Sequence, residues 1–198
     1  MVFILSAIKK PMNKILTKCL EVLRSGGLIL YPTDTIWGIG CDACREDAVE
    51  KVIQLKGRSA DKSLIVLLDT PGKLASYVRE VPELAYDLIE FSNKPLTIVF
   101  DGARNLAPNV LADDGSVGIR IVQHTFCTPL IQRFRKPIVS TSANISGAPA
   151  PTCFQDIAPE ILEGVDYIVP LEQDLQGNAK ASSIIKLGAS GLYRQIRP

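Results

Sequence analysis

The apolar run Leu28-Ile29-Leu30-Tyr31 decides the fold class, because of what stands on either side of it. Before it, residues 13–25 carry leucines at helical spacing and end at the stop signal Gly26-Gly27. After it, the pattern predicts a helix over 46–56 and a second apolar strand over 64–68. Buried strands that alternate with helices favour an α/β sheet with helices packed on it.

The rest of the chain continues this alternation. Helices are expected over 82–91 and 127–135, and Thr70-Pro71 has the residues of a helix start. Further strands are expected over 96–100, 117–122, 137–139, 166–169, 183–187 and 192–196. Several of these strands follow one another without a helix, which indicates a mixed sheet. No repeat or linker interrupts the pattern, so we expect a single domain over 1–198.

Composition limits the function classes. The 198 residues are 46% hydrophobic and 22% charged, so disordered and fibrous classes are excluded. The 22 basic and 21 acidic side chains give a net charge of +1, which excludes a general basic coat for nucleic acid. Residues 175–198 nevertheless hold basic side chains and no acid, which is compatible with one basic pocket. The chain shows neither signal-peptide order nor a run of about 18 apolar residues, so we expect a cytoplasmic protein.

Several catalytic and metal-binding motifs are incomplete. Cys41 and Cys44 form a CxxC pair, but His124 is the only histidine, so no metal site is expected and the thiols are interpreted as structural. The run Gly38 to Ala43 fits a dinucleotide glycine pattern, but Pro32 to Trp37 separate it from the strand. P-loop and GxSxG motifs are absent from the sequence.

Polar residues gather where the expected strands end. Thr33, Asp34 and Thr35 leave the strand over 28–31, and Ser140 to Gly147 leave the strand over 137–139. Each segment on its own is also typical of an ordinary turn or surface loop. Together they place hydroxyl, amide and backbone N–H donors at a sheet edge, where α/β proteins bind ligands.

Two cationic features point to an anionic ligand. Lys56-Gly57-Arg58 ends a helix, where cations also simply complement the helix dipole. A lysine and an arginine that converge would form a phosphate clamp. Arg120 stands alone in an apolar strand, where a buried charge needs a partner such as a carboxylate or a phosphate.

These segments together resemble the YrdC-like (YrdC/YciO/Sua) family. The resemblance rests on Tyr31 to Thr35, on Gly38 to Ala43, and on a KxR…SxN tetrad met by Lys56, Arg58, Ser142 and Asn144. Val117 to Ile121 and Ala181 to Ile185 follow in family order, so the resemblance covers residues 12–198. It implies a twisted open α/β sheet of the YrdC/RibB-like kind with a concave basic face.

The resemblance also implies an activity. The family makes threonylcarbamoyl-AMP and pyrophosphate from L-threonine, bicarbonate and ATP, with Mg²⁺ on the ATP, as a nucleotidyltransferase. The product serves threonylcarbamoyladenosine modification of tRNA, so tRNA-modification enzymes and RNA, including double-stranded RNA, are implied partners. The implied threonine site is Thr33, Arg120, Ser140 and Ser182. The implied nucleotide site is Lys56, Arg58, Ser142, Asn144 and Arg194, with Lys56 and Arg58 as the catalytic pair.

The chain departs from the family pattern in three loops, 92–95, 122–125 and 176–180, and has Ser59 where the family has proline after KxR. The tetrad is intact, so the departures affect loop shape first. An alternative interpretation is a YciO-type relative that binds nucleotide or double-stranded RNA without synthase activity. Threonine-dependent turnover of ATP separates the two interpretations.

Overall fold

The computed structural model describes residues 2–57, 64–170, 181–188 and 191–198, with side chains from Met12 onward. Its described strands are β1 (Ile29–Tyr31), β2 (Gly38–Gly40), β3 (Ile65–Leu68), β4 (Leu96–Phe100), β5 (Val117–Ile121), β6 (Ile138–Ser142), β7 (Tyr167–Ile168), β8 (Ser183–Leu187) and β9 (Tyr193–Arg197). They join in one sheet with the order β7-β1-β2-β6-β3-β5-β4-β8-β9. Neighbouring strands pair both parallel, as β3 does with β5, and antiparallel, as β4 does with β5. The predicted open mixed sheet is therefore confirmed.

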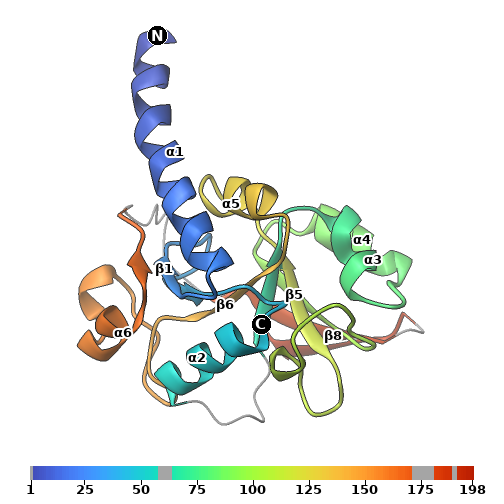
Figure 1. The fold of residues 1–198 in the computed structure, drawn as a ribbon. Helices are drawn as coiled ribbons and strands as arrows, with labels where there is room; N and C mark the ends of the chain where they lie inside the picture. Colours follow the sequence, from blue (N-terminus) through green and yellow to red (C-terminus); the bar gives the residue numbers. More distant parts are fainter. Residues whose placement is uncertain (1, 58–63, 171–180, 189–190) are drawn as a thin grey trace.

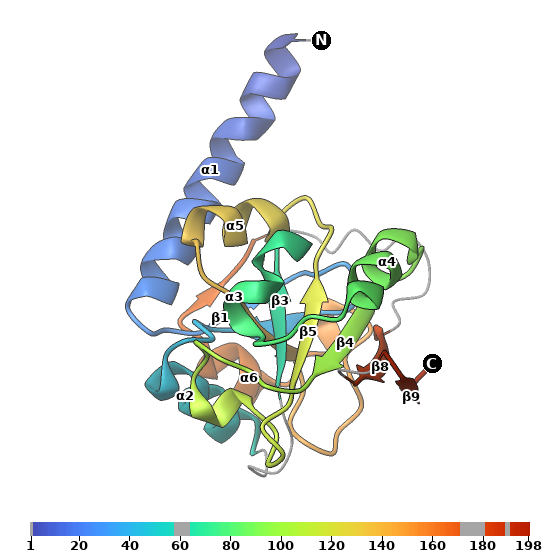
Figure 2. The same ribbon diagram turned by 90° about the vertical axis from the view of Figure 1, so that its right-hand side faces the viewer.

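Helices cover both faces of this sheet. The described α-helices are α1 (Val2–Arg24), α2 (Glu46–Lys56), α3 (Leu74–Tyr77), α4 (Glu83–Phe91), α5 (Cys127–Phe134) and α6 (Pro159–Gly164). Short 3-10 helices span Pro71–Lys73, Pro108–Val110 and Phe154–Asp156. Figures 1 and 2 show α1 beside α5, with the N-terminal part of α1 extending away from the body of the protein. Among the described helices, none has the length and apolar character to cross a membrane.

Alternating side chains on the central strands divide the core into two clusters. On β3, Val66 and Leu68 pack in a cluster with α2 and α4, whereas Leu67 packs in the other cluster with α1 and α5. Helices α1 and α5 cover only part of their face. The row of paired residues that begins at Leu67 continues through Arg120 and Thr97, two polar residues on the uncovered part. The fold thus leaves part of one sheet face open for a site.

Most predicted elements are present within one or two residues of their expected ends. The prediction was wrong for the first helix, which begins at Val2 instead of residue 13, and for the end of β6, which is Ser142 instead of residue 139. It missed β2 and α6. At Thr70-Pro71 the chain starts a single 3-10 turn before α3. The glycine run near residue 38 is strand β2, paired with β1 and β6, and not a nucleotide-binding turn.

Candidate functional site

A cavity of about 360 Å³ opens on the uncovered part of the sheet. Two rows of paired residues form its floor. Arg120, Thr97 and Ile184 lie side by side on β5, β4 and β8, and a second row runs through Ser140, Ile65, Gly118 and Val99. The loop after β1, the loop after β6 and the end of β9 form the walls. This volume lies at the lower end of the range for small-molecule sites.

The wall formed by the loop after β1 is stiffened by its own hydroxyl groups. The Thr33 hydroxyl donates to the carbonyl of Ile36 at 2.7 Å and accepts the backbone N–H of Thr35 at 3.0 Å. The Thr33 and Thr35 hydroxyls lie 2.9 Å apart, and both residues are buried. Below the turn, the Cys127 thiol of α5 donates to the Pro32 carbonyl at 3.4 Å. Both hydroxyls are therefore held at fixed positions facing the cavity.

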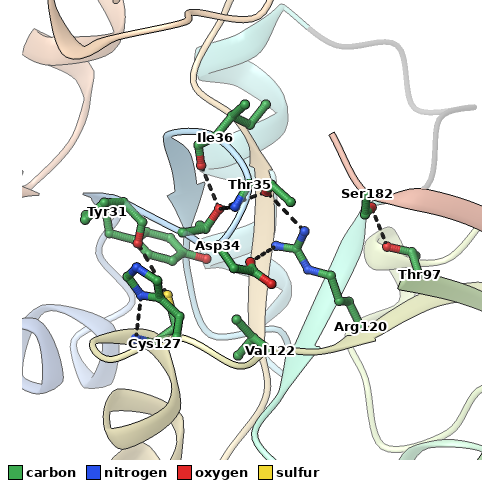
Figure 3. Close-up of polar contacts among 12 residues, drawn as sticks. Tyr31, Asp34, Thr35, Ile36, Thr97, Arg120, Val122, Cys127 and Ser182 are labelled. Carbon is green, nitrogen blue, oxygen red and sulfur yellow. Dashed lines mark hydrogen bonds and ion pairs between the residues drawn. The ribbon is translucent and has the colours of Figure 1, made fainter. Parts of the chain in front are cut away.

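Arg120 is the central cation of the cavity and is only 3% exposed. Its Nη1 donates to the Thr35 hydroxyl at 3.1 Å, and its Nη2 lies 3.2 Å from Oδ1 of Asp34. Figure 3 shows the guanidinium between Asp34 and Thr35 on one side and the Thr97 and Ser182 pair on the other. The buried Nε of Arg120 has no hydrogen-bond partner among the described residues, which is uncommon for a buried donor.

A second arginine faces the same cavity from the C-terminal strand. Arg197 donates from Nε and Nη2 to the Ser182 carbonyl, at 2.9 and 2.6 Å, and the Ser182 hydroxyl lies 2.8 Å from that of Thr97. Burial, and then the positive charge of Arg120, lower the pKa of Arg197. Two guanidinium groups thus converge on one cavity, which favours binding of a carboxylate or phosphate.

The loop after β6 is held by a buried lysine. The Lys56 ammonium, 1% exposed, donates to the carbonyls of Ser142 and Asn144, at 2.5 Å for Asn144. The Lys56 carbonyl accepts the N–H of Ser146 at 2.8 Å. The Asn144 amide donates to two carbonyls of its own loop, at Ile145 and Ala148. Helix α2 and this loop therefore form one unit beside the cavity.

The structure brings together most of the residues predicted for the site. Five line the cavity: Thr33, Arg120, Ser140, Ser142 and Ser182. Lys56 and Asn144 do not line the cavity; the Lys56 ammonium binds the carbonyls of Asn144 and of Ser142, the last residue of β6. Arg194 is exposed on β9 and is not among the lining residues, while Arg58 lies outside the described residues.

Sequence reasoning missed several lining residues, among them Thr97, Gly118 and Arg197. It included Thr35 in the polar segment after the first strand but gave it no role in the site. Thr97 carried a usable signal, because it is a hydroxyl residue inside an apolar strand. Arg197 lay one residue beyond the predicted last strand, since β9 ends at 197 and not at 196. Its approach to the cavity depends on the pairing of β9 with β8.

The CxxC pair lies apart from this lining. Cys41 is buried and Cys44 is partly exposed, and burial, with the charge of Asp42, raises the pKa of Cys44 to about 11. Its thiol donates to the Asn105 carbonyl at 3.3 Å. Within the described parts of the chain, three or more His, Cys, Asp or Glu side chains nowhere gather as they would around a metal ion.

Comparison with known proteins gives consistent matches along the chain. The model of the Sua5/YciO/YrdC family, described as "Telomere recombination", matches residues 21–198. A curated relative from Hahella chejuensis, named threonylcarbamoyl-AMP synthase, is 34% identical over 180 residues, which cover 90% of this chain and 96% of the relative.

Solved structures have the same fold. The structure of Pyrococcus abyssi Sua5 complexed with L-threonine superposes with a TM-score of 0.81 at 29% identity, covering 94% of this chain and 54% of that one. Escherichia coli YciO gives a TM-score of 0.79 over 93% of this chain and 88% of that one. At 20% identity, YciO supports the fold alone.

Proposed function

The chain belongs to the Sua5/YciO/YrdC family, and from this premise we propose that it is a threonylcarbamoyl-AMP synthase. The observation that carries the proposal is the convergence of Arg120 with a ring of fixed hydroxyl groups in one cavity. This arrangement suits a small hydroxy amino acid, whose carboxylate pairs with the guanidinium and whose hydroxyl exchanges hydrogen bonds. The Pyrococcus abyssi relative, which was solved with L-threonine, supports the same choice of substrate.

In the proposed reaction, the ammonium group of threonine gives a proton to bicarbonate, which yields CO₂ and water. The free amine then adds to CO₂ and releases a proton to water, forming a carbamate. A carbamate oxygen then attacks the α-phosphorus of ATP, the bond to the β-phosphate breaks, and pyrophosphate leaves. Phosphoryl chemistry of this kind depends mainly on alignment and on neutralisation of negative charge. The fixed donors of the cavity can both align the reactants and neutralise their negative charge. The attack on the α-phosphorus therefore needs little proton transfer by side chains.

We assign the threonine end to Thr33, Arg120, Ser140 and Ser182, which all line the cavity. The nucleotide phosphates are assigned to the loop of Ser142 and Asn144, with Lys56 holding that loop from below and Arg58 and Arg194 as further cations. Arg197 strengthens the proposal, because it is a second guanidinium at the cavity and has no carboxylate partner among the described residues.

Mg²⁺ is proposed to arrive with ATP. The described residues hold no cluster of carboxylates that could bind the ion without the nucleotide, so phosphate oxygens and water are its expected ligands. Bound there, Mg²⁺ would neutralise charge on the triphosphate. Transfer of the product to tRNA, contact with RNA and a cytoplasmic location remain predictions.

Threonine-dependent release of pyrophosphate tests the proposal. The full chain is mixed with ATP, Mg²⁺, bicarbonate and L-threonine, and each component is omitted in turn. We expect release only from the complete mixture. Nucleotide or RNA binding without release would support the YciO-type alternative, and no release with all components present would refute the proposed function.

A further inference from the structure

Asp34 forms a buried ion pair with Arg120 and has no role of its own in the proposed reaction. Nη2 of Arg120 lies 3.2 Å from Oδ1 of Asp34, and the side chains are 4% and 14% exposed. Oδ1 of Asp34 makes no hydrogen bond within the described residues, so the contact is a charge pair without hydrogen-bond alignment. Its effect on Arg120 therefore depends on the negative charge and position of the carboxylate.

Asp34 lies behind Arg120 and does not line the substrate cavity. It borders a second cavity of about 190 Å³, together with Ile121, Gln123 and residues 92–96. Ile121, the neighbour of Arg120 on β5, also borders the second cavity, whereas Arg120 itself lines only the first. A substrate in the first cavity would meet Arg120, and Asp34 would act on that substrate only through Arg120.

Two contacts hold the Arg120 guanidinium, and they differ in kind. Thr35 accepts a hydrogen bond from Nη1, and Asp34 compensates the charge at Nη2. With both terminal nitrogens engaged, Nε remains a buried donor whose partner is absent among the described residues. The guanidinium is thereby held in one orientation before any substrate binds, which lowers the cost of binding.

Charge makes Asp34 difficult to replace. Arg197 places a second positive charge near Arg120, and Asp34 is the one carboxylate that the described structure pairs with either arginine. A buried guanidinium that loses its counter-charge is strongly unfavourable.

We propose that Asp34 is a positioning residue that holds Arg120 in the orientation required to bind the substrate carboxylate. This inference rests on the proposed function for the identity of the substrate. A carboxylate that only competed with the substrate for Arg120 would have the opposite effect, because it would weaken threonine binding. The sign of the change in threonine affinity therefore decides between positioning and simple competition.

The test compares Asp34→Asn, Asp34→Glu and the matched control Asp42→Asn. Asp42 is another buried aspartate with a cationic partner, Lys136 at 2.7 Å, and it does not line the substrate cavity. We expect Asp34→Asn to raise the KM for threonine at least about tenfold, the effect of losing a charge-assisted contact, and to change the KM for ATP by less than about twofold. Asp34→Glu should recover part of the loss, because the second cavity has room for the longer side chain.

The control should lose stability and keep its KM for threonine. An unchanged or lowered KM for threonine in Asp34→Asn, or an equal rise in both Michaelis constants, would overturn the positioning role. A readout without substrate separates this result from failure of the proposed function. In the unmodified chain and in Asp42→Asn, the ¹⁵N-labelled Nε–H of Arg120 should exchange slowly with water, and in Asp34→Asn it should exchange fast. Equal exchange in all three proteins would overturn the proposal even if the chain released no pyrophosphate.

Discussion

Replacing Lys56 by methionine tests whether this lysine binds phosphate or supports the loop after β6. The sequence predicts a phosphate ligand, whereas the structure places the ammonium on the carbonyls of Ser142 and Asn144. Methionine keeps most of the apolar volume and removes the donor. We expect Lys56→Met to destabilise the loop after β6, and to lower activity because that loop is displaced.

The magnitude follows from the two carbonyls that lose their donor. Each polar group left unpaired in a buried position costs about 1–3 kcal/mol. Removing a buried ammonium also relieves its desolvation, which offsets part of this cost. The net loss should be about 2–4 kcal/mol, which for a chain of 198 residues lowers the melting temperature by about 10 °C.

The assay is urea unfolding followed by circular dichroism, with pyrophosphate release measured at a temperature where the variant is folded. Lys51→Met is the matched control on the same helix. Lys51 is exposed and donates to one carbonyl, that of Gly26 at 2.8 Å, so its loss should cost at most about 0.5 kcal/mol. If Lys56→Met abolished activity while the free energy of unfolding stayed within about 1 kcal/mol of the unmodified chain, the supporting role would be refuted and direct contact with the ligand favoured.

Three further changes test the cavity and the surface. In Gly118→Val, the added Cβ would lie 3.3 Å from Cγ2 of Thr97 on the cavity floor. The KM for threonine should therefore rise at least about tenfold, while the melting temperature changes little. Arg197→Gln should raise the KM for the anionic substrates by about tenfold, and the increase should be smaller in high salt. If the variant and the unmodified chain were equally active at all salt concentrations, a role of Arg197 in anion binding would be contradicted. The hydrogen bond from Lys186 holds the pKa of Asp114 below its usual range. The ionised Asp114 carboxylate therefore stabilises the fold near neutral pH, and this stabilisation is lost as the pH falls through the acidic range. Asp114→Asn should therefore narrow the difference between the urea midpoints at pH 7 and pH 3, and an unchanged difference would refute this account.

Local signals explain why parts of the fold could be predicted from the sequence. Helix α2 has its predicted ends, because Glu46 and Asp47 are acidic residues in its first turn and Gly57 follows it in the left-handed conformation with φ of 55°. Strand β2 carries no such signal, since two of its three residues are glycine. It forms because two neighbouring strands offer partners, and a Cβ at Gly40 would lie 2.6 Å from the Tyr31 ring and 2.8 Å from the Val139 carbonyl.

The site residues also divide into those with a local signal in the sequence and those that depend on strand pairing. Thr33 could be predicted, because it follows a recognisable strand at the edge where ligands bind. The sequence pattern places Ser140 after a strand over 137–139, whereas it lies within β6 and pairs with Ile65. Thr97 and Arg197 reach the cavity only through the order of β5, β4, β8 and β9, which pairs segments as distant in the chain as Leu96 and Ser183. Arg194 and Arg197 lie on the same short strand, and only the register with β8 determines which of them faces the cavity.

The row from Leu67 through Arg120 to Thr97 shows how one sheet face serves both stability and binding. Leu67 packs beneath α1 and α5, whereas its neighbour Arg120 is equally inaccessible to water and yet carries a charge. An apolar residue at position 120 would avoid the cost of burying that charge, and buried ion pairs rarely repay this cost in stability. The arginine and its aspartate partner, with an Nε that has no partner among the described residues, are therefore better explained by the ligand that Arg120 can bind than by the fold they help to form.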